Sequence, residues 1–89
     1  MLPILREMRA AVAAPIAAQP AAFHTTDETP CSTRLSQFPD ALETIQIARA
    51  DFTDFAKIAR AEGIGYLGGC CGCNAAYIRA MAYGIEDAA

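Results

Sequence analysis

Apolar residues three and four positions apart predict two helices in the first two thirds of the chain. In residues 2–13 the apolar side consists of Ile4, Leu5, Met8 and Val12. In residues 51–62 it consists of Phe52, Phe55, Ala56 and Ala59. The acidic residues at the start of the second segment, and the glycine just past its end, suit the two ends of a helix. We therefore expect each helix to pack one face on a core.

A third helix is expected to begin next to Asn74, whose side chain is a suitable N-cap. Its inner face would consist of Ile78, Met81, Ala82 and Ile85. Gly84 is a candidate for the residue that ends this helix.

Two short apolar runs are candidates for strands. Residues 64–67 indicate a short strand, and residues 14–18 allow either a buried parallel strand or a further turn of helix. The order of elements is then helix, strand, long loop, helix, strand and helix, which is typical of an α/β fold.

The long loop covers residues 25–48 and is mostly polar, with Pro30 and Pro39 as breakers. Ile45 and Ile47 alternate with polar residues, so a very short strand is possible near the end of the loop. A connection of this length is typical of a functional lid or a disordered segment.

Composition and charge exclude several classes of partner. The 89 residues are 54% hydrophobic and 19% charged, with a net charge of −3. No basic patch is present, so nucleic acid and anionic membrane are not expected as partners. The apolar runs are too short to span a bilayer. Small domains bury only about 60% of the surface that the unfolded chain exposes, so we expect marginal stability in isolation.

The four cysteines do not form the pattern of a disulfide scaffold. Three of them crowd into positions 70, 71 and 73, where they cannot staple distant loops. Reduced thiols in a cytoplasmic protein are the better interpretation.

The adjacent pair Cys70 and Cys71 is the main candidate site. The pair follows the second predicted strand and precedes the third helix, and glycines at positions 68, 69 and 72 allow the backbone to bend. A helix N-terminus lowers the pKa of a nearby thiol, and thiolates are preferred zinc ligands. Two alternatives are a pair of small buried side chains and a strained vicinal disulfide.

Three further residues could take part in a metal site. His24 is the only histidine, but a hydrogen-bonded structural role is the better interpretation. Cys31 is expected to be an ordinary loop thiol. Cys73 is either incidental or a substitute ligand, and the incidental interpretation is favoured because three ligands so close in sequence strain tetrahedral geometry.

The cysteine pair lies in a segment that resembles a known family. Residues 65–72, Gly-Tyr-Leu-Gly-Gly-Cys-Cys-Gly, with residues 77–82, are similar to the closing segment of the homocysteine S-methyltransferases, and more closely of the betaine-homocysteine type. Residues 19–27 resemble that family's Gln-Pro-x-x-aromatic-His-Thr-x-Asp segment. The resemblance covers most of the chain from position 19 onward, whereas residues 1–18 match only in kind.

The resemblance implies the C-terminal portion of a TIM (β/α)₈ barrel. Residues 1–89 would form part of the homocysteine-binding domain, namely its last two strands and their flanking helices, and residues 14–18 would then be a strand. A whole barrel needs roughly 250 residues. We therefore expect an incomplete barrel whose open strand edges could allow self-association.

The resemblance also implies a zinc ion held by three cysteines. Cys70 and Cys71 match the adjacent pair as ligands, not nucleophiles, and the earlier third cysteine has no counterpart in these 89 residues. No catalytic residue is assigned, and the substrate-binding residues are unknown. The implied reaction is methyl transfer from betaine or a similar donor to homocysteine, giving methionine.

We expect the chain to be a fragment of such an enzyme that is inactive alone. Two alternatives are a small thiol-rich zinc-binding module and a dithiol redox protein that uses Cys70, Cys71 and Cys73.

Overall fold

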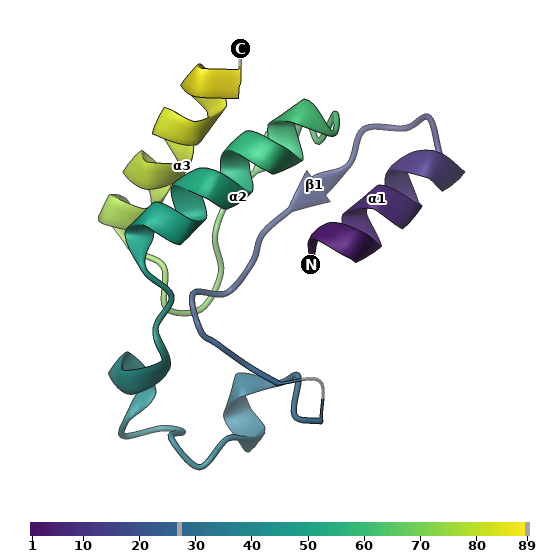
Figure 1. Cartoon of the computed structure of the whole chain (residues 1–89). Coiled ribbons are helices and arrows are strands. Elements are labelled where there is room, and N and C mark those ends of the chain that lie inside the picture. Colours follow the sequence, from purple (N-terminus) through teal and green to yellow (C-terminus); the bar gives the residue numbers. More distant parts are fainter. Residues whose placement is uncertain (27, 89) are drawn as a thin grey trace.

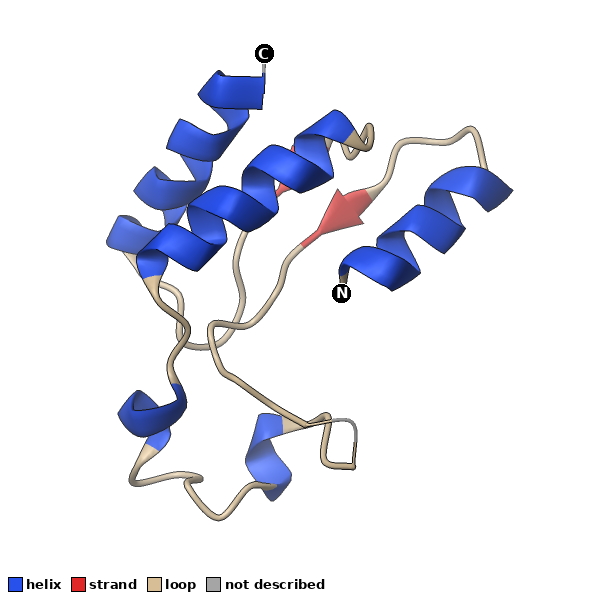
Figure 2. Cartoon of the chain, viewed as in Figure 1, coloured by secondary structure: helices blue, strands red, loops and turns tan. Residues whose placement is uncertain are grey.

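The computed structural model describes residues 1–26 and 28–88 and has the expected order of elements (Figures 1 and 2). Asp27, the last residue of the 19–27 motif, lies outside the described residues. The helices and strands are α1 (Leu2–Ala11), β1 (Ala17–Ala18), η1 (Ser32–Arg34), η2 (Leu42–Ile45), α2 (Arg49–Ala61), β2 (Tyr66–Leu67) and α3 (Ala75–Ala88). This mixed α/β arrangement agrees with the prediction. None of the described helices has the length and apolar character needed to cross a bilayer.

The two strands form a parallel pair with α2 as the connection between them. Ala17 pairs with Tyr66 and Ala18 with Leu67. Both strands are shorter than the predicted runs, because each has one neighbour in the described structure. The two chain segments nevertheless stay side by side beyond the strands, since the Cys70 amide donates to the Pro20 carbonyl at 3.1 Å.

The helices α2 and α3 pack on each other and form the larger core. The rings of Phe52 and Tyr77 meet edge to face, with centroids 5.1 Å apart. The Tyr77 hydroxyl donates to the Ile47 carbonyl at 2.7 Å. Thr53 Oγ1 donates to the Ala80 carbonyl at 2.8 Å. These contacts fix the rotation of α3 about its axis.

The predicted inner face of α3 is partly wrong. Met81 is buried, but Ile78 is 48% exposed and Ala82 is also exposed. The observed face consists of Tyr77, Ala80, Met81 and Gly84, with Ile85 partly buried. The helix is rotated toward Tyr77 because the ring of that residue packs on Phe52 and its hydroxyl donates a hydrogen bond to the Ile47 carbonyl.

Gly84 does not end α3, contrary to the prediction. It is buried within the helix, where a Cβ atom would collide with the Thr53 carbonyl oxygen and contact Ala56 Cβ at 3.0 Å. A side chain would therefore push the two helices apart, so this glycine permits their close approach.

A second core joins α1, β1 and α2. Its buried members are Leu5, Ile16, Ala18, Ala59 and Ile64. The predicted apolar face of α1 is only partly buried, because Ile4 is 62% exposed and Met8 and Val12 are exposed as well. The helix ends at Ala11, before the predicted position 13, because the Arg9 guanidinium donates to the Val12 and Ala14 carbonyls, both at 2.8 Å, and stabilises the extended exit.

Helix α2 agrees with its prediction at both ends to within two residues. Phe52, Ala56 and Ala59 are buried on its inner face, and Phe55 is partly buried. Gly63 follows the helix with φ +90°, the left-handed conformation that glycine adopts without strain.

The loop of residues 25–48 is closed at its neck. The His24 amide donates to the Ile45 carbonyl, and the Ile47 amide to the Ala22 carbonyl, both at 2.7 Å. Together with a single antiparallel bridge between Phe23 and Gln46, these bonds replace the very short strand predicted near position 45. The rest of the described loop contains the two 3₁₀ segments and forms a lobe below the helices in Figure 1.

Candidate metal centre

The cysteine pair lies in a tight turn between β2 and α3. We call residues 70–73 the thiol turn. The Cys73 amide donates to the Cys70 carbonyl at 3.1 Å, and Gly72 has φ +83° at the third position, which is the geometry of a type II turn. A Cβ atom on Gly72 would lie 2.6 Å from Phe23 Cζ. Both backbone conformation and space therefore require glycine at position 72.

Both thiols of the pair reach solvent and lie next to each other. Cys70 and Cys71 are exposed free cysteines, and their sulfurs are 3.8 Å apart. The turn achieves this, because successive side chains on a straight strand would point to opposite faces. The alternatives of a buried apolar pair and of a vicinal disulfide do not fit this geometry.

The sulfur separation fits two ligands of one zinc ion. Two thiolates, each about 2.3 Å from a tetrahedral zinc, are about 3.8 Å apart. The sulfurs could thus hold such an ion without a change in the backbone. Zinc has a strong preference for thiolate sulfur, so the chemistry of the two donors fits as well.

The pKa of Cys71 departs from the expectation for a thiol at a helix N-terminus. The side-chain hydrogen bond with Cys70, and then the charge of that neighbour, raise the pKa of the Cys71 thiol above its ordinary value. The expectation of a lowered pKa is therefore wrong for Cys71, because the neighbouring Cys70 thiol disfavours the charged form of the Cys71 thiol. A metal ion would have to displace the proton that the two sulfurs share.

The third nearby thiol, that of Cys73, contacts a backbone carbonyl of the neighbouring segment. Cys73 is half-buried, and its sulfur lies 3.7 Å from the Pro20 carbonyl oxygen. Within the described residues no group of three histidine, cysteine or acidic side chains could hold a metal ion. This geometry supports the incidental interpretation of Cys73.

His24 directly precedes the long loop and Cys31 lies within it, so neither residue is part of the thiol turn. Both are exposed. Cys31 Sγ lies 2.9 Å from Thr33 Oγ1, and the hydrogen bonds with Thr33 lower the pKa of the Cys31 thiol. His24 and Cys31 instead line a large cleft whose lining includes no residue of the thiol turn.

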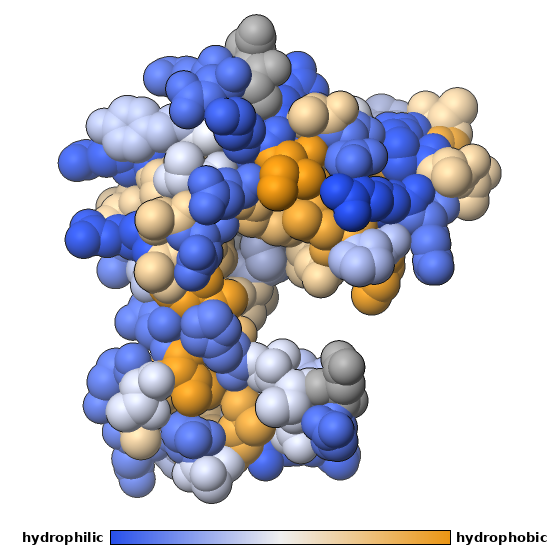
Figure 3. All heavy atoms as spheres, in the orientation of Figure 1, coloured by the Kyte–Doolittle hydropathy of each residue, from blue (hydrophilic) through white to orange (hydrophobic). Residues whose placement is uncertain are grey.

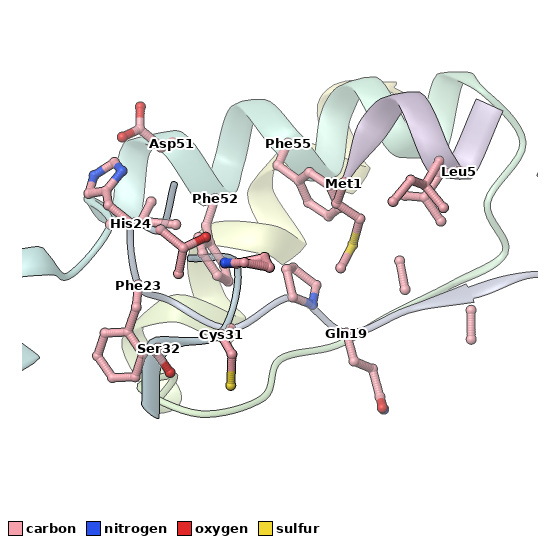
Figure 4. A pocket seen from close by; sticks show the side chains of 18 of the residues that line it. Met1, Leu5, Gln19, Phe23, His24, Cys31, Ser32, Asp51, Phe52 and Phe55 are labelled. Atoms are coloured by element: carbon pink, nitrogen blue, oxygen red, sulfur yellow. The ribbon is translucent and has the colours of Figure 1, made fainter. Parts of the chain in front are cut away.

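This cleft has a volume of about 930 Å³ and is mainly apolar. Figure 4 shows Leu5 of α1 and the preceding Met1 toward one end and Phe23 and His24 at the other. In Figure 3, hydrophobic side chains reach the surface between α2 and α1. The cleft runs past β1, so it lies beside the part of the strand that has no described neighbour.

Hydrogen bonds made by one nearby and one distant residue hold the C-terminal end of the thiol turn. Asn74 Oδ1 accepts hydrogen bonds from the amides of Ala76 at 3.0 Å and Tyr77 at 3.4 Å, which confirms the predicted N-cap. Gln46 Nε2 donates to the Gly72 carbonyl at 2.9 Å. Sequence reasoning missed Gln46, because no local pattern reveals a partner 26 positions away.

Comparisons with known proteins agree with the resemblance. The family model described as homocysteine S-methyltransferase matches residues 1–85. The betaine-homocysteine S-methyltransferase 1 of Danio rerio is 43% identical over 68 residues, which are 72% of this chain and 16% of that protein. The S-methylmethionine-homocysteine S-methyltransferase BHMT2 of Pongo abelii is 37% identical over 78 residues, 83% of this chain and 21% of that protein.

The betaine-homocysteine S-methyltransferase 1 of Xenopus laevis is 39% identical over 77 residues, 82% of this chain and 18% of that protein. The chain thus spans about a fifth of the length of the curated relatives it matches. A match over nearly all of its length shows that the chain belongs to the homocysteine S-methyltransferase family.

Proposed function

We propose that this chain supplies the two adjacent zinc ligands, Cys70 and Cys71, of a homocysteine S-methyltransferase. The observation that carries the proposal is the pair of exposed sulfurs 3.8 Å apart, held in place by the turn. Family membership supports homocysteine methylation as the reaction of the whole enzyme. Betaine or a similar methyl donor is suggested by the names of the relatives, and methionine would be the product.

The two cysteines act as ligands and not as nucleophiles. Bound zinc would lower the pKa of a coordinated substrate thiol, so that its sulfur can attack a methyl group at neutral pH. For this purpose Cys70 and Cys71 must both lose their protons, and their exposure leaves a substrate free access from solvent. The turn holds the two sulfurs at the required separation before any ligand arrives, which limits the entropy lost on binding.

The fold that we propose for the whole domain is a TIM barrel, with β1 and β2 as its last two strands. The parallel β1–α2–β2 unit supports this proposal, since such units are the repeating element of that barrel. The third ligand and the groups that bind homocysteine would come from parts of the domain outside this chain. We therefore expect no methyl transfer by these 89 residues alone.

The cellular setting and the partners are part of the same proposal. Four free thiols, two of which must stay reduced to bind zinc, suit the reducing cytoplasm. The open edges of a two-stranded parallel sheet suit pairing with another chain, either a second copy or a polypeptide that carries the rest of the domain.

Metal analysis of the purified chain tests the proposal. We expect bound zinc in the unsubstituted chain and its loss in Cys70→Ser and in Cys71→Ser. Cys31→Ser is the matched control and should keep the metal, because that thiol lies in the loop. Equal zinc content in all four proteins would overturn the assignment. Methyl transfer to homocysteine by the chain alone would contradict the expectation of an inactive fragment.

A dithiol switch is a second candidate function, supported by one observation. Cys70 and Cys73 have Cys-x-x-Cys spacing, and their hydrogen-bonded turn brings the two Cα atoms within about 7 Å, close to disulfide range. Oxidation by a disulfide such as oxidised glutathione would move two electrons and two protons to that oxidant. A mass loss of two hydrogens that Cys73→Ser abolishes would favour this function over a metal site.

A further inference from the structure

The thiol turn is held by three successive backbone carbonyls, each of which accepts one hydrogen bond. The Cys70 carbonyl accepts from the Cys73 amide at 3.1 Å, and the Cys71 carbonyl from the Ala22 amide at 2.9 Å. The Gly72 carbonyl accepts from Gln46 Nε2 at 2.9 Å. Among the described residues, Gln46 is the side chain that completes this set.

Gln46 is itself held in place by the neck of the long loop. It pairs with Phe23 in the antiparallel bridge, and the backbone bonds of Ile45 and Ile47 lie on either side. The Phe23 ring lies against Gly72, since a Cβ atom there would approach three ring carbons to within 3.0 Å. Phe23 therefore packs on the turn, while Gln46 bonds to it.

We propose that Gln46 is a positioning residue for the cysteine pair. Its amide fixes the peptide group between Gly72 and Cys73, and with the Ala22 bond it sets the direction in which the pair faces. Gln46 and the Gly72 carbonyl are half-buried, so water replaces the lost bond poorly. The 25–48 loop thus controls the geometry of the thiols although it contributes no ligand.

The effect of Gln46 on metal affinity rests on the proposed zinc function, whereas its effect on the geometry of the turn does not. Loss of a group that orients a metal ligand typically weakens metal binding 10–100-fold. We expect about tenfold weaker binding for Gln46→Met, which keeps the size of the side chain and removes the donor. Gln37→Met is the matched control, because it makes the same change in the same loop, where Gln37 contacts Ser36.

The test combines Co²⁺ titration with amide hydrogen exchange on the full chain. Gln46→Met should lower the Co²⁺ affinity, followed by the thiolate-to-cobalt absorption band, about tenfold. It should also speed hydrogen exchange of the Ala22 and Cys73 amides. Gln37→Met should change neither the affinity nor the exchange rates. Unchanged affinity and exchange in Gln46→Met would overturn the proposal. Equally accelerated exchange throughout α2 and α3 would also overturn it, because Gln46 would then serve overall stability.

Two results separate this role from the zinc function. If the unsubstituted chain binds no Co²⁺ but Gln46→Met still speeds exchange at the turn, the positioning role stands and the metal function fails. If Gln46→Met does not fold, the unsubstituted chain gives the answer by NMR. The side-chain amide signal of Gln46 should shift on addition of Co²⁺. As a metal-free readout, the same signal should shift when the thiols of the turn are alkylated. The Gln37 signal should stay unchanged in both experiments. An unshifted Gln46 signal in both cases would refute the role.

Discussion

Replacement of Gly72 by alanine should be strongly destabilising, because the residue meets two independent constraints. Its φ of +83° costs a residue with a side chain about 1 kcal/mol. The new methyl group would also lie 2.6 Å from Phe23 Cζ, and overpacking of this kind costs about 1–3 kcal/mol. The sum is about 2–4 kcal/mol, a large share of the stability of a small domain.

Gly65→Ala is the matched control. A Cβ atom there has no neighbour within 4 Å, and Gly65 is not among the positive-φ glycines. We expect Gly72→Ala to lower the melting temperature, followed by circular dichroism, by about 8 °C or more, and Gly65→Ala to change it little. Equal melting temperatures for the two variants would refute the argument.

A double-mutant cycle separates the two costs. In a Phe23→Leu background the methyl group of Ala at position 72 meets no ring, so only the conformational term of about 1 kcal/mol should remain. If Gly72→Ala costs the same in both backgrounds, contact with Phe23 does not contribute, and the packing half of the explanation is wrong.

Four further predictions concern other parts of the molecule. Tyr77→Phe should lower the free energy of unfolding in urea by about 1 kcal/mol, because it leaves the Ile47 carbonyl without its donor but keeps the ring contact, and no change would contradict that hydrogen bond. At pH 7 iodoacetamide should modify Cys31 faster than Cys71, since the pKa of the first thiol is lowered and that of the second is raised, and peptide mapping that finds the reverse order would disprove this. The apparent zinc affinity of the chain should rise as pH rises through the neutral range, because the thiol pair must release its protons, and a pH-independent affinity would exclude these ligands. Ile4→Glu should weaken any self-association seen by sedimentation, since Ile4 is 62% exposed beside the apolar cleft, and an unchanged oligomer would place the contact elsewhere.

Sequence patterns predict those elements whose structure is determined by interactions between residues a few positions apart. The helix of residues 49–61, the Asn74 cap and the glycine after α2 follow from spacing, side-chain chemistry and backbone freedom, which act within a few positions. The adjacency of two usable thiols at positions 70 and 71 was also predictable, because glycines flank them and a strand and a helix adjoin them. The bond from Gln46 was not, because it depends on how a long loop closes.

The faces of α1 and α3 were predicted less well, and the reason is physical. A helical pattern reports which residues are apolar, but the neighbours decide which of them are covered. In α3, the Tyr77 hydroxyl has a hydrogen-bond acceptor inside the protein, the Ile47 carbonyl, so the helix places Tyr77 inward and Ile78 is exposed.

In α1, the exposure of Ile4 and Met8 has a different cause from that in α3. Both residues line the apolar cleft beside β1, and β1 pairs with β2 alone in the described structure. Parallel sheets are normally covered on both faces and continue on both sides of an internal strand. The family relatives are about five times longer than the matched part of this chain, so they have the residues to provide such a cover. In the larger domain that we propose, such residues would cover Ile4 and Met8, and the apolar pattern of α1 would then describe a buried face.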